Sequence, residues 1–264
     1  METITITNHK GGVGKTTTAQ ALATGLMHRG YKVLGIDIDP QTNFTYTAGI
    51  EPHDEKQNIY DLFKTHETTS SLQAIQKTPT GFSMIAGALE LAGADMEFSH
   101  QGREYILKEI LEPLKKTYDY CIIDTPPTLG ILTVNALTAS QKIIVPVEAD
   151  IYSLQGLSQL QGVIMNAKKY SNPNLQIAGL LITKYNPRAV INKSLKEELE
   201  AIAFKLYTKV FKSWIRETVA IKEVHFLQGD LFKEYPNHNV TKDYNAFIDE
   251  FLGKGDKNDG KEKI

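Results

Sequence analysis

A glycine-rich loop between a predicted strand and a predicted helix constrains the fold of this chain more than any other feature. The loop reads Lys10-Gly11-Gly12-Val13-Gly14-Lys15-Thr16-Thr17. It follows an alternating run at 3–7, which predicts a strand, and precedes an apolar-periodic run at 18–26, which predicts a helix. Glycines let consecutive backbone N–H groups face one anion, and the N-terminus of the following helix attracts negative charge. The arrangement predicts a phosphate site in an α/β fold.

Two side chains of this loop have the chemistry needed for a nucleoside triphosphate. Lys15 supplies a positive charge for the β- and γ-phosphates, and the Thr16 hydroxyl is a ligand for Mg²⁺. The predicted phosphate-binding set is completed by Gly11, Gly12, Val13, Gly14 and Thr17. The strict pattern G-x-x-x-x-G-K-[ST] is not met, because His9 stands where its first glycine belongs. A second lysine, Lys10, precedes the glycines, where ordinary phosphate loops have none.

The rest of the chain alternates between strand and helix patterns. It predicts a single-domain, doubly wound, mostly parallel sheet with helices on both faces. Further strands are expected at 32–37, 82–86, 118–124, 142–147 and 177–183, and helices at 103–116, 153–169, 190–206 and 241–252. A length of 264 residues with 41% apolar content is enough for one sizeable core. We expect one domain over 1–252 and a disordered polar tail over 253–264.

Acidic residues follow two of the predicted strands. The first cluster is Asp37-Ile38-Asp39-Pro40-Gln41, and the second is Asp124-Thr125-Pro126-Pro127. Ligands bind beyond the carboxyl ends of the strands in such a sheet, so both clusters are expected near the phosphate loop. Carboxylate oxygens such as those of Asp124 suit Mg²⁺. An isolated aspartate at a strand end is about as often a turn or helix cap, so the prediction depends on the combination of motifs.

The loop and the two acidic clusters, in this order, resemble the deviant Walker A family of P-loop ATPases. That family includes the ParA partition proteins, MinD and the nitrogenase iron protein, and the resemblance covers about 1–252. It implies ATP and Mg²⁺ as cofactors and a homodimer that sandwiches ATP. Lys10 then reaches the phosphates of the partner subunit, Lys15 assists catalysis, and Asp39 positions the attacking water. Asp37, Asp124 and Thr16 are the implied metal-site residues, and hydrolysis is expected to be slow.

The base site is expected after a later strand. Thr183-Lys184-Tyr185-Asn186 is similar to the guanine-reading pattern [NT]-K-x-D, but Asn186 lacks the carboxylate that accepts hydrogen bonds from guanine. The family prefers ATP and contacts the base from a loop that corresponds to 215–220. Arg216 and Thr218 stand there in place of the proline and asparagine that are common in the family, so the sequence departs from the family at this point.

The segment from Lys184 to Lys222 contains nine basic and four acidic residues, a local charge of +5 that leaves −7 for the rest of the chain. Composition alone favours an ordinary solvated face with mixed charge. ParA relatives, however, bind DNA without sequence preference in the ATP state, and a local positive surplus is typical of such surfaces. The candidate DNA contacts are Lys193, Lys196, Lys209, Lys212, Arg216 and Lys222.

Other features separate the branches of the family. The single cysteine, Cys121, lies in an apolar strand, whereas the nitrogenase iron protein needs several cysteines for its cluster. The mixed-charge, glycine-containing C-terminus differs from the membrane-binding amphipathic helix of MinD. We therefore expect no membrane contact. The first strand begins within three residues of the N-terminus without a basic leader, so we expect a cytoplasmic protein with no operator-binding extension. The resemblance to DNA-binding ParA proteins implies that it is nucleoid-associated.

The sequence therefore predicts a ParA-type ATPase for plasmid or chromosome partition. Its expected partners are a second copy of the chain, nonspecific DNA and a ParB-like centromere-binding protein that stimulates hydrolysis. One alternative stays open, which is a MinD-like or cargo-positioning regulatory ATPase that does not act in DNA segregation.

Overall fold

The computed structural model describes residues 1–51, 56–65, 71–148, 150–186 and 191–254. These residues form one eight-stranded sheet in the order β3-β4-β2-β5-β1-β6-β7-β8. The strands are β1 (Glu2–Ile6), β2 (Val33–Asp37), β3 (Ile75–Lys77), β4 (Ser83–Ile85), β5 (Tyr120–Asp124), β6 (Lys142–Glu148), β7 (Gln176–Tyr185) and β8 (Val210–Arg216). Neighbouring strands pair in parallel except β3 and β4, which are antiparallel. The predicted mostly parallel sheet is confirmed.

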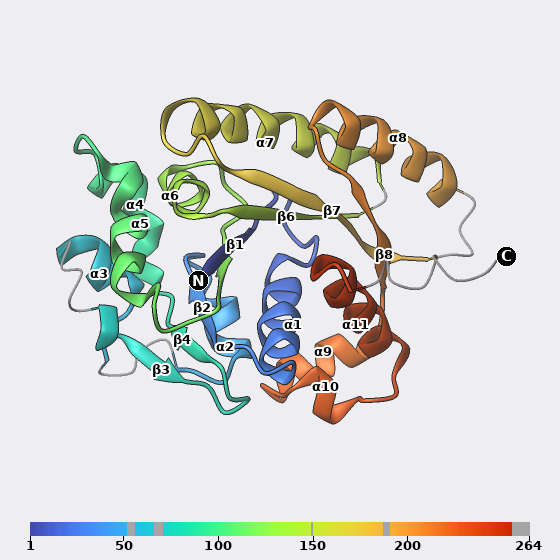
Figure 1. Ribbon diagram of the computed structural model, residues 1–264, viewed down its shortest axis with the longest axis horizontal. Helices are drawn as coiled ribbons and strands as arrows, with labels where there is room; N and C mark the ends of the chain where they lie inside the picture. The colour runs from blue at the N-terminus through green and yellow to red at the C-terminus, as the bar shows by residue number, and fades with distance from the viewer. Residues whose placement is uncertain (52–55, 66–70, 149, 187–190, 255–264) are drawn as a thin grey trace, which may run out of the picture.

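Helices cover both faces of the sheet (Figure 1). One face carries α1 (Lys15–His28), α2 (Asn43–Thr47), α9 (Val219–Phe226), α10 (Leu231–Glu234) and α11 (Asn239–Phe251). The other face carries α3 (Ile59–Thr65), α4 (Ala94–Glu97), α5 (Ile106–Leu111), α6 (Ile131–Ala139), α7 (Ile151–Tyr170) and α8 (Ile191–Lys205). Short 3₁₀ turns are η2 (Leu89–Gly93), η3 (Arg103–Tyr105) and η4 (Glu112–Leu114). The sheet is therefore doubly wound.

The central strands divide their side chains between the cores on the two faces. In β1, Ile4 packs in the core that includes α1 and α11. Thr5 points to the other face, where its hydroxyl donates a 3.2 Å hydrogen bond to the carbonyl of Ala136 in α6. In β5, Ile122 and Ile123 alternate in the same way. A strand buried on both faces carries apolar residues at almost every position, which explains the continuous apolar runs in the sequence.

The strand order reverses at β1, which lies between β5 and β6. The register pairs Ile6 of β1 with Asp124 of β5, and Asp124 with Asp37 of β2. The carboxyl ends of these three strands therefore meet at one edge of the sheet. Such a topological switch point is where open α/β sheets bind ligands.

Some elements differ from the sequence predictions. The helix expected at 103–116 is divided into η3, α5 and η4. Pro113 lies in η4 and lacks the N–H that would continue α5 beyond Leu111. The polar stretch before residue 80 contains α2, α3 and β3, which are too short for a clear periodic pattern. β8 was not predicted, and it forms one edge of the sheet.

The C-terminal helix α11 ends at Phe251, next to the predicted end of the domain. The predicted disordered tail lies outside the described residues, apart from Gly253 and Lys254. Cys121 is buried in β5, as predicted. Among the described helices, none combines the length and apolar character needed to cross a bilayer.

Candidate nucleotide site

The phosphate loop connects β1 to α1 and lines an open cleft of about 500 Å³. Gly12 (φ 76°) and Gly14 (φ 85°) lie in the left-handed region, which residues with a Cβ rarely adopt. Gly14 is the N-cap of α1, and no side chain of the described residues caps this end of the helix. The N–H groups of its first turn are therefore available to an anion in the cleft.

Lys15 lies in the same cleft with only 7% of its surface exposed. Its Nζ donates a 3.1 Å hydrogen bond to the carbonyl of Lys10. Burial lowers the pKa of the Lys15 ammonium, while the nearby carboxylates of Asp124 and Asp39 act in the opposite direction. A partly desolvated cation at the start of a helix is well placed to neutralise phosphate charge.

Two of the three predicted metal-site residues, Thr16 and Asp124, are in direct contact. Thr16 Oγ1 donates a 2.6 Å hydrogen bond to Asp124 Oδ2, and Asp124 Oδ1 is buried with no hydrogen-bond partner among the described residues. Burial, reinforced by the charge of Asp37, raises the pKa of Asp124 well above its usual range. A free carboxylate oxygen beside a hydroxyl fits Mg²⁺, which takes few protein ligands and completes its shell with phosphates and water.

Asp37 and Asp39 have different surroundings. Asp37 Oδ1 accepts a 3.0 Å hydrogen bond from the N–H of Asp39, and its Oδ2 accepts 2.9 Å hydrogen bonds from the N–H and the hydroxyl of Thr45. Burial raises the pKa of Asp37 to about 7. Asp39 lines the cleft and accepts a 3.0 Å hydrogen bond from the N–H of Gln41. Asp37 therefore stabilises the turn that presents Asp39, and its predicted role at the metal is indirect.

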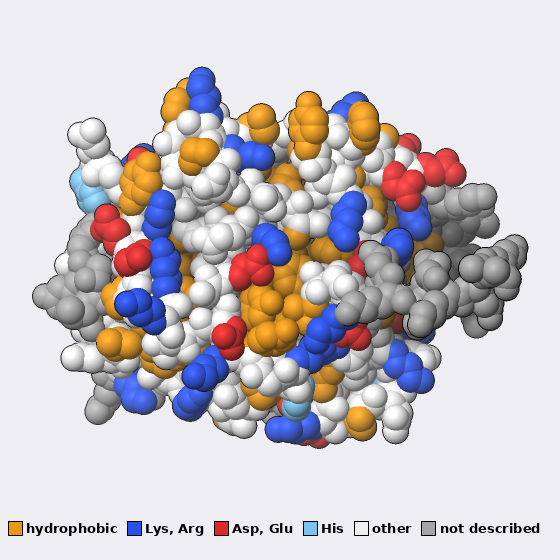
Figure 2. Space-filling view, in the orientation of Figure 1, with side chains coloured by type: hydrophobic (Ala, Val, Ile, Leu, Met, Phe, Trp, Pro, Cys, Tyr) orange, Lys and Arg blue, Asp and Glu red, His pale blue; other side chains and the backbone are white. Residues whose placement is uncertain are grey.

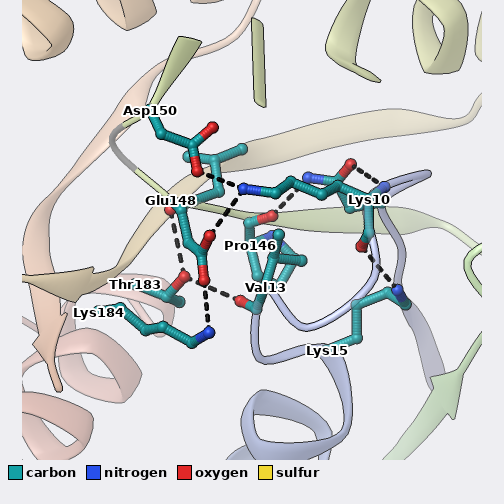
Figure 3. Close-up of polar contacts among 10 residues, drawn as sticks. Lys10, Val13, Lys15, Pro146, Glu148, Asp150, Thr183 and Lys184 are labelled. Carbon is teal, nitrogen blue, oxygen red and sulfur yellow. Dashed lines mark hydrogen bonds and ion pairs between the residues drawn. The ribbon is translucent and has the colours of Figure 1, made fainter. Parts of the chain in front are cut away.

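The side chain of Lys10 extends toward the end of β6 (Figure 3). Its Nζ donates a 2.7 Å hydrogen bond to Glu148 Oε2 and another to Asp150 Oδ2. Burial lowers the pKa of Lys10, but the hydrogen bonds to Asp150 and Glu148 outweigh it, so the pKa is raised overall. In this structure the predicted trans lysine is thus bound within its own subunit.

A second cavity of about 210 Å³ adjoins the phosphate loop on the side of β8. Both predicted base contacts, Arg216 and Thr218, line it. Arg216 forms a bidentate pair with Asp243, with Nε–Oδ2 and Nη2–Oδ1 distances of 2.6 and 2.8 Å. Thr218 caps α9 by accepting a 3.3 Å hydrogen bond from the N–H of Ala220. Both residues therefore line a cavity beside the phosphate loop and make hydrogen bonds within the protein itself, and their contact with a base stays a prediction.

The candidate DNA contacts are distributed around the β8 edge of the sheet. α8 carries Lys193 and Lys196, the β8 region carries Lys209, Lys212 and Arg216, and α9 carries Lys222. α8 and α9 lie on opposite faces of the sheet (Figure 1). The Lys193 side chain lies outside the described residues. Figure 2 shows basic side chains scattered among acidic ones on the visible face. The +5 segment therefore spans two faces and an edge.

Sequence reasoning missed the carboxylates that bind Lys10. Glu148 directly follows the apolar run at 142–147, as Asp37 and Asp124 follow theirs, so the same rule could have identified it. It also missed Tyr46 of α2 and His225 of α9, which line the cleft. Their helices are too short to stand out in the sequence.

The chain is similar to known proteins over most of its length. A family model described as an AAA domain (AAA_31) matches residues 1–177. The chain is 40% identical to the sporulation initiation inhibitor protein Soj of Bacillus subtilis, covering 83% of this chain and 86% of Soj. It is 37% identical to the chromosome partitioning protein ParA of Myxococcus xanthus, covering 83% of this chain and 77% of that protein.

Solved structures share the fold over almost the whole chain. Cobyrinic acid a,c-diamide synthase of Mycobacterium smegmatis, with a bound ATP analogue and magnesium, has a TM-score of 0.83 and 28% identity, covering 96% of this chain and 94% of that one. A putative plasmid partition protein of Borrelia burgdorferi bound to AMPPNP has a TM-score of 0.79 and 28% identity, covering 96% and 99%.

Proposed function

The chain belongs to the ParA-type family of P-loop partition ATPases, and we propose that it hydrolyses ATP slowly in the service of DNA partition. ATP and Mg²⁺ occupy the cleft, and the ATP-bound form is a homodimer. This dimer binds DNA without sequence preference in the cytoplasm, at the nucleoid. A ParB-like centromere-binding protein stimulates its hydrolysis.

The observation that carries the ATPase proposal is the free Oδ1 of Asp124 beside the hydroxyl of Thr16. When bound there, Mg²⁺ supplies charge neutralisation on the phosphate oxygens. Lys15 adds a second positive charge, and Asp39 orients the attacking water from the same cleft. Phosphoryl transfer needs little covalent work from a protein, so these positioning and electrostatic roles are sufficient.

The direction of Lys10 supports a site completed by a second subunit. Its carbonyl lies next to Lys15, but its ammonium lies at the end of β6 and does not line its own cleft. A lysine that points away from its own cleft can reach the phosphates of a facing subunit once it leaves Glu148 and Asp150. There it acts in the way that an arginine finger acts in other nucleotide hydrolases.

The structural likeness to cobyrinic acid a,c-diamide synthase does not alter the proposal. One fold carries many activities, and the sequence identity with Soj is 40%, against 28% with the synthase. A cargo-positioning ATPase shares every feature of the nucleotide site and differs in its cargo. Binding to DNA therefore separates the two candidate functions.

Binding to an arbitrary DNA duplex tests the proposal when measured with ATP, with ADP and without nucleotide over a series of salt concentrations. We expect binding with ATP only, with an affinity that falls steeply as salt rises. Equal binding in the three states, or none at low salt, contradicts a role in partition. ATP hydrolysis in the same samples shows separately whether the ATPase assignment stands.

A further inference from the structure

Two carboxylates at the end of β6 hold Lys10 within its own subunit (Figure 3). Lys10 Nζ lies 2.7 Å from Glu148 Oε2 and also contacts Asp150 Oδ2. The side chains of Lys10, Glu148 and Asp150 are 24%, 18% and 34% exposed. The contact is therefore partly shielded from water, and all three side chains keep some exposed surface.

The backbone around this contact is fixed. Asn8 Nδ2 donates a 2.7 Å hydrogen bond to the carbonyl of Pro146 in β6. The Thr183 hydroxyl of β7 donates to the carbonyls of Val13 and Val147, at 2.8 and 3.2 Å. These bonds attach the loop to the ends of β6 and β7, once before Lys10 in the chain, at Asn8, and once after it, at Val13. Release of Lys10 therefore needs rotation of one flexible side chain and no movement of the loop.

Glu148 is shared between two ammonium groups. Lys184 Nζ lies 2.5 Å from Glu148 Oε1, while Lys10 contacts Oε2 of the same carboxylate. When Lys10 leaves, Glu148 keeps its ion pair with Lys184 and loses the one with Lys10. Opposite charges at hydrogen-bond distance attract, so the two carboxylates compete with phosphate oxygens for the Lys10 ammonium.

We propose that Glu148 and Asp150 are positioning residues that hold Lys10 in cis, and that its release sets the ATP concentration at which the dimer forms. This inference rests on the proposed function, because it takes Lys10 as the group that reaches the phosphates of the facing subunit. One ammonium cannot bind both sets of anions. The apparent affinity for dimer formation is therefore the intrinsic affinity multiplied by the fraction of chains in which Lys10 is released.

The first test needs no nucleotide and no dimer. An amine-acylating reagent is applied briefly to the wild-type chain and to the variant Glu148→Gln/Asp150→Asn, and modification of Lys10 is measured by peptide mass spectrometry. Paired with carboxylates, the Lys10 ammonium keeps its proton and reacts slowly. We expect about tenfold faster modification in the variant, because the carboxylates that favour the charged form of Lys10 are gone.

A matched control is Glu112→Gln, which removes the exposed ion pair with Lys115 far from the loop. It should leave the reactivity of Lys10 as in the wild type. Equal Lys10 reactivity in the wild type and the double variant overturns the proposal. Thermal unfolding checks that the variants fold, and each single substitution is measured in the same way if the double variant does not.

The second test follows dimer formation by light scattering during an ATP titration. The double variant should reach half-maximal dimer at about tenfold less ATP than the wild type. Asp150→Glu keeps the charge and should restore wild-type behaviour. An unchanged or higher ATP requirement in the double variant overturns the proposal. If the wild type forms no dimer at any ATP concentration, the proposed function fails, and the reactivity test alone then decides whether the carboxylates hold Lys10.

Discussion

Thr16 at the start of α1 and Asp124 at the end of β5 are joined by a 2.6 Å hydrogen bond between residues 108 positions apart. The bond uses Oδ2 of the carboxylate, and Oδ1 is buried without a hydrogen-bond partner in the part of the chain that the structure describes. A buried acceptor without a partner destabilises a protein unless something else binds it. We therefore propose that this oxygen and the Thr16 hydroxyl bind the Mg²⁺ ion.

Asp124→Asn should weaken the effect of Mg²⁺ on nucleotide affinity by about 10–100-fold. The substitution neutralises the ligand but leaves the phosphate loop intact, so nucleotide binding in EDTA should stay within about twofold of the wild type. Calorimetric titration with ATP, with and without Mg²⁺, measures both quantities. Without nucleotide, the variant should be no less stable than the wild type. Burial disfavours the charged form of Asp124 and raises its pKa, so a neutral amide is tolerated at this position. The same Mg²⁺ dependence in variant and wild type contradicts the assignment.

The pKa of Asp37 predicts how the stability of the free protein changes with pH. Burial raises this pKa from 3.8 to about 7 in the folded protein. Between these values the folded protein keeps a proton that the unfolded chain has lost, so the free energy of unfolding falls as pH rises. The contribution is fully present below about pH 4 and is lost as the pH rises through about 7.

Asp37→Asn should therefore reduce this decline by up to about 1.4 kcal/mol per pH unit. The variant loses stability at every pH, since one amide oxygen replaces two oxygens that accept three hydrogen bonds. For this reason the two proteins are compared by the slope of the free energy of unfolding against pH. Denaturant unfolding measures this slope between about pH 4 and 7. If the free energy of unfolding changes with pH in parallel in the wild type and the variant, Asp37 does not titrate in this pH range.

Lys10→Ala should retain nucleotide binding through Lys15 and the loop amides, but lose ATP-dependent dimerisation and about 10²–10³-fold of ATP turnover. Fluorescent-nucleotide titration, light scattering and phosphate release measure the three properties. Lys184→Ala is the matched control, because it removes the other ammonium bound to Glu148 and should not abolish dimerisation. Wild-type turnover in Lys10→Ala removes the argument for a trans lysine.

Asp39→Ala should separate binding from chemistry. Asp39 lines the cleft, while Thr16 and Asp124, the proposed metal-site residues, are hydrogen-bonded to each other. Without the group that orients water, the protein should accumulate as an ATP-bound dimer. Light scattering with ATP measures dimer formation, and a phosphate-release assay measures ATP hydrolysis. A variant that stays monomeric with ATP, or one that hydrolyses ATP at the normal rate, shows that Asp39 has another role.

The parts of the site that were predictable are those encoded within a few positions. Glycines before a helix predict the phosphate loop, and acids after apolar runs predict Asp39 and Asp124. Parallel strands end at one edge, so their proximity to the loop also followed from the sequence. The direction of the Lys10 side chain did not follow, because it depends on Glu148 and Asp150, which lie 138 and 140 positions away.

The arrangement of the basic segment was equally inaccessible to the sequence. A run of lysines and arginines gives a local charge, but not the faces on which the side chains lie. The missed strand β8 takes the chain from α8 on one face of the sheet to α9 on the other. It therefore divides the candidate DNA contacts between two faces.

Substitution of single basic residues should show which of these faces binds DNA. Phosphate contacts release counterions, so log affinity falls with log salt by about 0.9 per contact. Removing one contacting residue should weaken binding on unrelated sequences alike and flatten the slope by about one unit. A dimer presents each residue twice, so a change of about two units is expected where both copies touch one duplex.

The variants Lys196→Ala in α8, Lys212→Ala in β8 and Lys222→Ala in α9 sample the two faces and the edge. Lys108→Ala in α5, outside the basic segment, is the matched control. ATP hydrolysis without DNA confirms that each variant folds. Lys209 lies 3.8 Å from Glu250, which already neutralises part of its charge. Substitution of Lys209 should therefore change the salt dependence of DNA affinity less than substitution of a DNA-contacting lysine that has no carboxylate nearby. If DNA binding persists and every substitution leaves the slope unchanged, the segment is an ordinary solvated surface and the DNA site lies elsewhere.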